Sequence, residues 1–214
     1  DDLEKHILAL GYKRLAPYTF EQKKLRAFGY VHSVPGYPKV FLSELETAKF
    51  SKQLQDIVHG LCAQVDASRV EEASVFWAGL LWDIITYETY QTLLAESEYA
   101  AWVAVMGLRA NHFTIDVNAL KTLKSIEEVL DFVQDEGYTL NTSGGRVKGS
   151  PQVLLEQGST MADRIEWTFQ GGEKHVIPTC YYEFARRYPD ASGNLYQGFV
   201  AASADKIFES TNTQ

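Results

Sequence analysis

The sequence has 214 residues, 45% of them hydrophobic, and a formal net charge of −8. This length and composition fit one soluble domain with a sizeable core, while the acidic charge without any stripe of Lys and Arg argues against a nucleic-acid partner. No apolar run has the length of a membrane span, and no signal peptide or disulfide framework is visible around Cys62 and Cys180. We therefore expect a cytoplasmic protein with no membrane partner; the sequence does not indicate an oligomeric state.

Within a single domain spanning residues 1–214, residues 1–48 are predicted to form a first module. Residues 3–10 have the pattern of the end of a helix, which Gly11 stops. Strands are expected at residues 25–32 and 39–45, because both runs are rich in β-forming residues and a Pro-Gly turn signal separates them.

Residues 49–107 are predicted to be a helical connection between two modules. From Ser51 onward, apolar residues recur at the spacing of one helix face. Further helices are expected from Glu71 to Leu81 and from Thr86 to Ala101.

Residues 108–214 are predicted to form a second module with a C-terminal segment. A strand around His112 precedes a helix over residues 126–134, which Ser125 caps and Gly137 ends. Three strands are then expected, at residues 153–157, 164–169 and 176–187, followed by a short helix at residues 205–209. The order of these elements is βαβββ. Residues 1–45 resemble the same unit without its first strand, which indicates a weak internal repeat. The expected fold class is therefore α+β.

Two strand segments carry the side chains that predict chemistry. In the first, Phe113 and Ile115 alternate with His112, which places the histidine on the opposite face of the strand. In the second, Glu183 shares a face with Arg187, opposite Phe184. A histidine and a glutamate on separate strands are two of the three ligands in the 2-His-1-carboxylate set that holds non-haem Fe(II).

Each of these side chains also has an ordinary structural interpretation. A single buried histidine often bonds only to a backbone carbonyl, and from the residues alone that alternative is about as probable as metal binding. A carboxylate in an apolar strand is costly to bury without a partner, which a metal or Arg187 could supply. His6, His32, His59 and His175 have no comparable context and are expected at the surface.

Longer stretches of the sequence resemble one known family. They are KKLRA at residues 23–27, PKVFLSEL at 38–45, RANHFT at 109–114, KGSP at 148–151, LEQGSTMAD at 155–163 and YEFARRY at 182–188. These resemble the 2-oxoadipate dioxygenase/decarboxylases, also called 2-hydroxyglutarate synthases, within the vicinal-oxygen-chelate superfamily. The resemblance runs over nearly the whole chain.

The resemblance implies a fold and an activity. The fold would be paired βαβββ modules that form a curved, barrel-like mixed sheet around a metal. Fe(II) would be the cofactor, a 2-oxo acid and O2 the small-molecule partners, and oxidative decarboxylation with hydroxylation the reaction, converting 2-oxoadipate to 2-hydroxyglutarate and CO2. His112 and Glu183 would be metal ligands.

The family pattern also begins with a strand that carries a further histidine and an arginine. This chain reaches Leu10-Gly11-Tyr12 almost at once. We therefore expect the remaining ligand and its arginine upstream of Asp1, and these 214 residues to be inactive without them.

Four polar residues are candidates for binding the substrate. Arg187 is expected to hold a carboxylate through a bidentate contact. Gln157, Ser159 and Ser43 are expected to line the site, whereas Lys148 is expected to be a solvated loop residue.

Two other functions would fit the same predicted site. A glyoxalase-like isomerase or lyase would use Zn or Ni without O2, and a non-catalytic small-molecule binding module would lack the metal. Oxygen uptake distinguishes the first alternative, and metal analysis distinguishes the second.

Overall fold

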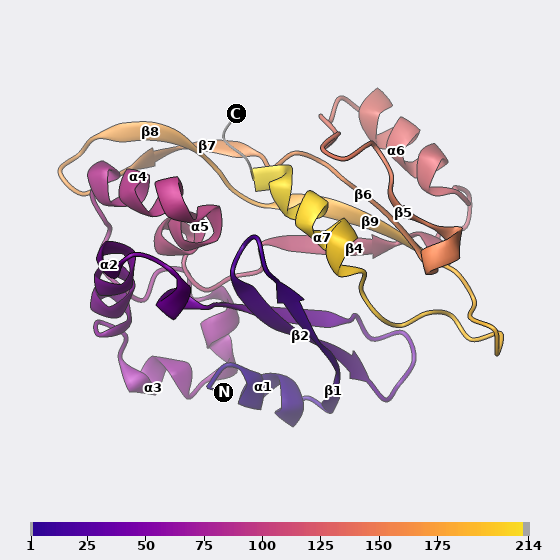
Figure 1. The fold of residues 1–214 in the computed structure, drawn as a ribbon, viewed down its shortest axis with the longest axis horizontal. Helices are drawn as coiled ribbons and strands as arrows, with labels where there is room; N and C mark the ends of the chain where they lie inside the picture. The colour runs from indigo at the N-terminus through magenta and orange to yellow at the C-terminus, as the bar shows by residue number, and fades with distance from the viewer. Residues whose placement is uncertain (1, 212–214) are drawn as a thin grey trace. The chain divides into compact units, whose positions relative to one another are not determined.

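The computed structural model describes residues 2–211, and the chain divides into two compact units. The first unit holds the residues up to 110 together with residues 165–177, and the second holds residues 111–164 and those from 178 onward. Both units combine helices with β-sheet (Figure 1), which confirms the α+β class. No helix within residues 2–211 is long and apolar enough to cross a membrane.

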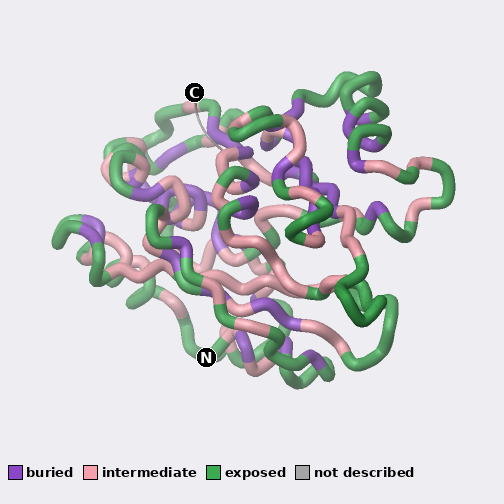
Figure 2. Tube along the Cα trace, turned by 45° about the vertical axis from the view of Figure 1, so that its right-hand side comes forward, coloured by how far each residue is buried: buried purple, intermediate pink, exposed green. Residues whose placement is uncertain are grey.

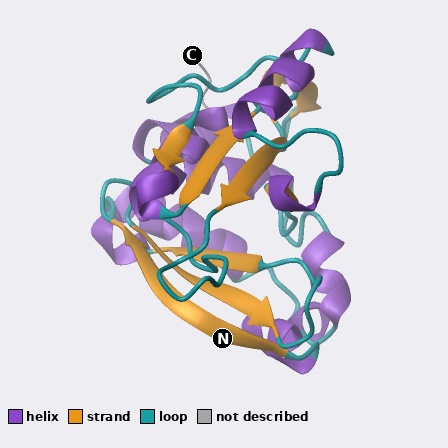
Figure 3. Ribbon diagram, turned by 90° about the vertical axis from the view of Figure 1, so that its right-hand side faces the viewer, coloured by secondary structure: helices purple, strands orange, loops and turns teal. Residues whose placement is uncertain are grey.

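The first unit opens with one helix and a three-stranded antiparallel sheet (Figure 3). These elements are α1 (Glu4–Ala9), β1 (Tyr12–Phe20), β2 (Leu25–His32) and β3 (Val40–Leu45), with the strands in the order β1-β2-β3. The expected strands at 25–32 and 39–45 are confirmed, but β1 was not predicted. Pro17 lies inside β1, which an edge strand tolerates because the missing N–H is not needed for a second neighbour.

The helices of the first unit follow the sheet in the chain. They are α2 (Lys52–Cys62), α3 (Ala67–Val70), α4 (Tyr87–Glu96) and α5 (Glu98–Met106). The Ser51 side chain caps α2 as the sequence predicts. The single helix expected from Thr86 to Ala101 is wrong, because extended backbone at Ser97 ends α4 and the Ser97 side chain caps α5.

The helix expected at residues 71–81 is also wrong. Only a short 3₁₀ segment forms there, over Ala73–Trp77. Gly79 then adopts a φ of +69°, outside the helical region, and its carbonyl accepts a hydrogen bond from the Leu108 N–H at 2.9 Å. Pairing with a distant segment therefore replaces the local helix.

A β-hairpin of β7 (Arg164–Thr168) and β8 (Lys174–Pro178) supplies residues 165–177 of the first unit. The Gln170 N–H donates to the Ile85 carbonyl at 2.9 Å. Phe169 is buried and packs against the rings of Tyr87 and Tyr90. Hence this hairpin does not contribute to the sheet of the second module, where the sequence had suggested it.

The second unit is built on a four-stranded sheet of order β4-β9-β6-β5. Its elements are β4 (His112–Asp116), α6 (Ile126–Asp135), β5 (Lys148–Ser150), β6 (Leu155–Ser159), β9 (Tyr181–Arg187) and α7 (Ala201–Phe208). β4 pairs with β9 in parallel, and the other neighbours are antiparallel. The order βαβββ is therefore made by β4, α6, β5, β6 and β9.

Two predicted strands of this unit have different bounds in the structure. Residues 176–187 form two strands, because Pro178 has no N–H and the Thr179 N–H turns to the Asp163 carbonyl at 2.7 Å. β6 begins two residues later than expected, since Pro151–Val153 forms a 3₁₀ turn. The C-terminal helix is longer than residues 205–209.

Helix α6 covers one face of this sheet, and its sequence explains why it forms. The Ser125 side chain and Glu128 make a reciprocal capping box at its start, and Gly137 has a φ of +93° just after its end. Its buried residues pack in one cluster with Phe184 of β9; they are Ile126, Val129, Leu130 and Val133. Figure 2 shows how buried and exposed positions interleave along the chain. A Cβ on Gly158 of β6 would come within 2.7 Å of the Leu130 methyl groups, so a larger residue there would displace the Leu130 side chain.

Both units contain a helix followed by a three-stranded antiparallel meander. α1 precedes β1, β2 and β3, while α6 precedes β5, β6 and β9. This topology matches the weak repeat inferred from the sequence. The strands described in residues 2–211 form separate sheets of three, four and two strands rather than a closed barrel.

Candidate functional site

The face of the four-stranded sheet opposite α6 carries the polar residues and is called the site face here. Pairing aligns His112 with Tyr181 and Thr114 with Glu183 across β4 and β9. Glu183 lies opposite Ser159 of β6. Phe184 points to the other face and packs with the buried residues of α6. The alternation that the sequence predicted for both strands therefore holds.

His112 and Glu183 meet on the site face. The imidazole Nε2 lies 3.5 Å from Glu183 Oε2, and the Glu183 side chain is only 6% exposed. His112 Nδ1 lies 3.2 Å from Asn111 Oδ1. An amide oxygen can only accept, so Nδ1 carries the proton in this contact and Nε2 presents its lone pair toward the carboxyl group.

Burial shifts the pKa values of this pair in opposite directions. Loss of solvent lowers the pKa of His112 to about 4 and raises the pKa of Glu183 to about 7. A hydrogen bond from Gln157 and the charge of Arg187 oppose the shift at Glu183 without cancelling it. Near neutral pH the imidazole is therefore neutral, while the carboxyl group is only partly ionised and keeps a proton in a large fraction of the molecules; a bound cation could replace that proton.

Gln157 is part of the same group of side chains. Its Nε2 donates to Glu183 Oε1 at 2.7 Å, and the residue is 2% exposed. This bond fixes one carboxylate oxygen and leaves Oε2 toward His112. Its own Oε1 is buried and has no hydrogen-bond partner within residues 2–211.

Ser159 is on the site face, but its hydroxyl is engaged by the C-terminal segment. Its Oγ lies 2.9 Å from Ser210 Oγ and accepts from Asn141 Nδ2 at 3.4 Å. Asn141 Nδ2 also donates to the Lys206 carbonyl in α7. Ser159 therefore ties α7 to β6, and its proposed contact with substrate stays a prediction.

Arg187 is held by the segment that follows β9. Its Nη1 donates to the carbonyls of Tyr196 at 3.1 Å and Gly198 at 2.6 Å, and its guanidinium lies 5.5 Å from the Phe199 ring centroid. Its charge also acts on Glu183, whose pKa it lowers. Arg187 thus holds the segment after β9, and its binding of a substrate carboxylate stays a prediction.

Lys148 and Ser43 lie in different units. Lys148 is 3% exposed and pairs with Gln157 across β5 and β6, so the expectation of a solvated loop lysine is wrong. Its Nζ donates to the Asn141 carbonyl at 2.6 Å, and burial lowers its pKa to about 8. Ser43 belongs to β3 of the first unit, where its hydroxyl donates to Tyr99 Oη at 3.3 Å.

Tyr181 is a site-face residue that the sequence interpretation missed. Its ring stacks on the His112 ring with centroids 4.7 Å apart and planes 14° apart. The residue is 3% exposed, and burial raises the pKa of its hydroxyl well above the usual range. Its position two residues before Glu183 was the available signal, because alternate residues of a strand share a face.

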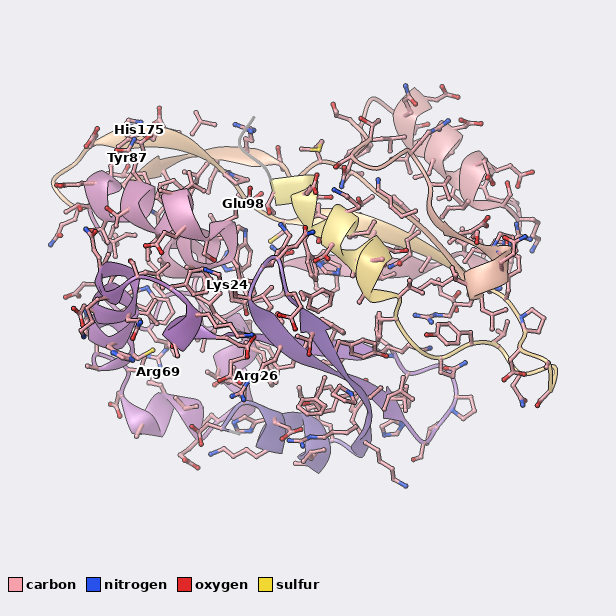
Figure 4. The ribbon with its side chains drawn as sticks, in the orientation of Figure 1. Lys24, Arg26, Arg69, Tyr87, Glu98 and His175 are labelled. Atoms are coloured by element: carbon pink, nitrogen blue, oxygen red, sulfur yellow. The ribbon has the colours of Figure 1, made fainter. Side chains whose placement is uncertain are left out.

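The remaining histidines of the described chain lie in other contacts. His6 Nε2 is 2.7 Å from the Val70 carbonyl, and His32 Nε2 is 3.1 Å from the Leu10 carbonyl. His175 stacks on Tyr87 with ring centroids 3.4 Å apart (Figure 4). None joins His112, and no group of three or more His, Cys, Asp or Glu able to hold a metal occurs among the described residues.

The His112–Glu183 pair nevertheless fits two neighbouring positions of a metal shell. Metal–ligand bonds of about 2.1 Å place adjacent donor atoms about 3 to 3.4 Å apart, close to the 3.5 Å observed. A neutral imidazole and a buried carboxyl group that forms no ion pair with Lys or Arg in residues 2–211 suit such an ion.

Comparison with known proteins identifies relatives over most of the chain. A protein of Arabidopsis thaliana named 2-oxoadipate dioxygenase/decarboxylase, chloroplastic, is 35% identical over 235 aligned positions, which cover 99% of this chain. The chain spans 63% of the length of that relative.

Solved structures agree with this relationship. The crystal structure of the hydroxyglutarate synthase in complex with 2-oxoadipate from Oryza sativa has a TM-score of 0.90 and 34% identity, covering 99% of this chain and 75% of that one. A crystal structure from Shewanella frigidimarina, described as that of a "putative hydrolase", has a TM-score of 0.89 and 51% identity, covering 94% of this chain and 78% of that one. The family model described as 2-oxoadipate dioxygenase/decarboxylase matches residues 1–193, so this chain belongs to that family.

Proposed function

We propose that the protein catalyses the Fe(II)-dependent oxidative decarboxylation and hydroxylation of a 2-oxo dicarboxylic acid, with 2-oxoadipate as the substrate. In the balanced reaction, 2-oxoadipate and O2 give 2-hydroxyglutarate and CO2. The observation that carries the proposal is the His112–Glu183 pair on the site face, with a half-buried imidazole, a buried carboxyl group and donor atoms 3.5 Å apart, in a member of this family.

The chain's own residues prepare the two donor atoms. Asn111 holds the proton of His112 on Nδ1, and Gln157 holds Glu183 Oε1, so that Nε2 and Oε2 remain directed at each other. Bound Fe(II) would supply chelation of the keto and C1 carboxylate oxygens and activation of O2. Burial of Glu183 keeps water from the carboxyl group and strengthens the electrostatic contacts around it.

Substrate selection is assigned to a cationic group near this pair. The charge of Arg187 acts on Glu183 from the same face of β9, which supports a role in attracting a dicarboxylic acid. The solved Oryza sativa relative is described as a complex with 2-oxoadipate, which supports the same class of ligand here.

The surrounding architecture is part of the proposal. The repeated helix-and-meander topology supports paired modules that form a curved, barrel-like surface around the metal. A third protein ligand would complete the set, as an open 2-His-1-carboxylate site requires. A cytoplasmic location also stays a prediction, while the Arabidopsis relative is named as chloroplastic.

The test is turnover of 2-oxoadipate by the whole protein with Fe(II), compared under aerobic and anaerobic conditions, with O2 consumption measured in the aerobic reaction. We expect equal amounts of O2 consumed, CO2 released and 2-hydroxyglutarate formed. Glu183→Ala should abolish the reaction, while Glu136→Ala, at an exposed position after α6, should leave it unchanged.

The same experiment separates the alternatives. Turnover without O2 consumption, supported by Zn or Ni, would assign a glyoxalase-like isomerase or lyase. Protein that binds a 2-oxo acid without retaining any metal would be a binding module. Either result contradicts the proposed oxygenase.

A further inference from the structure

The Tyr181 side chain occupies a defined position beside the His112–Glu183 pair. Its ring stacks on the imidazole at 4.7 Å, and Tyr181 and Glu183 are alternate residues of β9 on the site face. The ring also packs in a buried hydrophobic cluster with Ala162 and Ile207. These contacts fix where the ring lies.

Packing explains why an aromatic ring occupies position 181, but it does not explain why that ring carries a hydroxyl group. The Tyr181 Oη atom is buried and has no hydrogen-bond partner within residues 2–211. Taking a hydroxyl out of water without a new hydrogen bond costs free energy. Phenylalanine would make the same stack and the same apolar contacts without that cost, so the phenol oxygen requires another explanation.

A second buried atom without a partner within residues 2–211 belongs to the amide group that bonds to Glu183. Gln157 donates to Glu183 through Nε2, while its buried Oε1 has no partner in the described chain. Tyr181 and Gln157 are 3% and 2% exposed and come from neighbouring strands. Two residues of the site face, one stacked on His112 and one bonded to Glu183, thus each keep a buried polar atom without a partner in the described chain, which favours a polar ligand over an apolar filling of the site.

We propose that Tyr181 is a substrate-binding residue whose hydroxyl donates a hydrogen bond to an oxygen atom of the 2-oxo acid bound at His112 and Glu183. This assignment rests on the proposed function. A 2-oxo acid offers keto and carboxylate oxygens and no donor of its own at these atoms, so a phenol O–H has the complementary chemistry. The ring stack holds the donor in place before the ligand arrives, which reduces the entropy lost on binding.

The test is Tyr181→Phe in the whole protein, because it removes only the hydroxyl. Binding of 2-oxoadipate to the Fe(II)-loaded protein is measured anaerobically by calorimetry. We expect the dissociation constant to rise about tenfold, which corresponds to the loss of one hydrogen bond. Fe(II) affinity without the acid should not change.

Thermal unfolding of the metal-free and ligand-free protein gives an independent readout. Removal of an unpartnered buried hydroxyl should leave the melting temperature unchanged or raise it. A hydroxyl with a structural role would instead lower the melting temperature. The matched control is Tyr182→Phe, since Tyr182 is 51% exposed and alternates to the opposite face of β9; both measurements should stay at the wild-type values.

Three results would overturn the assignment. Unchanged affinity of Tyr181→Phe for 2-oxoadipate would show that the hydroxyl does not contact the ligand. A lower melting temperature with reduced Fe(II) affinity would show that it acts on the protein through His112. If the wild-type protein with Fe(II) does not bind the acid at all, the proposed function fails and this assignment fails with it, a result distinct from failure in the variant alone.

Discussion

His112 and Glu183 lie diagonally across two parallel strands, with Nε2 and Oε2 3.5 Å apart. The register places Tyr181 directly opposite His112, and Glu183 two residues further along β9. The same offset therefore creates both the stack of two rings and the contact between two titratable groups. The pairing of β4 with β9 therefore sets how His112, Tyr181 and Glu183 lie relative to one another.

Replacement of Glu183 by Gln should stabilise the metal-free protein above pH 7. The folded pKa of about 7 lies above the ordinary value of 4.5, so the folded state holds its proton more tightly. Stability is consequently lost as the pH rises from about 4.5 through about 7. Urea unfolding should give Glu183→Gln a higher free energy of unfolding than the wild type at pH 8, a smaller difference at pH 6 and none at pH 4. Glu136→Gln should show no difference at any of these pH values.

Metal affinity should depend on one proton between pH 5 and 7. A bound cation displaces the proton of Glu183, while His112, with a pKa of about 4, is already neutral. Affinity for Co(II) or Fe(II) should rise about tenfold per pH unit in this range and level off above pH 7. A slope of two protons, measured by titration at several pH values, would contradict the assignment of a neutral imidazole.

Asn111 should control which nitrogen of His112 carries the proton. Asn111→Leu removes the acceptor 3.2 Å from Nδ1, and we expect metal affinity to fall about 10- to 100-fold. Nitrogen NMR of the histidine ring should show a shift from the Nδ1–H tautomer in the metal-free protein. Asn111→Asp keeps an acceptor oxygen and should retain the Nδ1–H tautomer of His112. If Asn111→Asp loses that tautomer, hydrogen bonding by residue 111 does not determine which nitrogen carries the proton.

Arg187→Ala should raise the Michaelis constant more for 2-oxoadipate than for a monocarboxylic 2-oxo acid, because a cation near the site favours the second carboxylate. The variant also frees the carbonyls of Tyr196 and Gly198. Equal effects on both acids, together with faster proteolysis of residues 195–199, would limit Arg187 to holding that segment.

Leu130→Ala should destabilise the protein by about 2–5 kcal/mol, because Leu130 is fully buried between α6 and the sheet. Phe132→Ala in the same helix is the control. Phe132 is 52% exposed, so its replacement should lower the free energy of unfolding far less. Chemical denaturation of both variants checks this. Similar losses for the two would contradict the assignment of the buried face of α6.

The sequence by itself determined the local elements whose signals are complete within a few residues. The helix after Ser125 forms where its cap, its apolar spacing and Gly137 agree, and the strands at His112 and Glu183 alternate as their residues predict. The long motifs, above all RANHFT and YEFARRY, also identified the family. These features depend on short-range backbone and side-chain preferences, which a sequence displays directly.

Only the tertiary structure decided which distant groups meet. β1 forms despite Pro17 because it is an edge strand, and residues 165–177 join the first unit through contacts such as that of Gln170 with Ile85. The sequence separates Asn111 and His112 from Tyr181, but the register of β4 against β9 brings them together. Burial then shifts the pKa values of His112 and Glu183 and leaves the Tyr181 hydroxyl without a partner in the described chain, because desolvation depends on what surrounds a side chain in space rather than on its neighbours in the sequence.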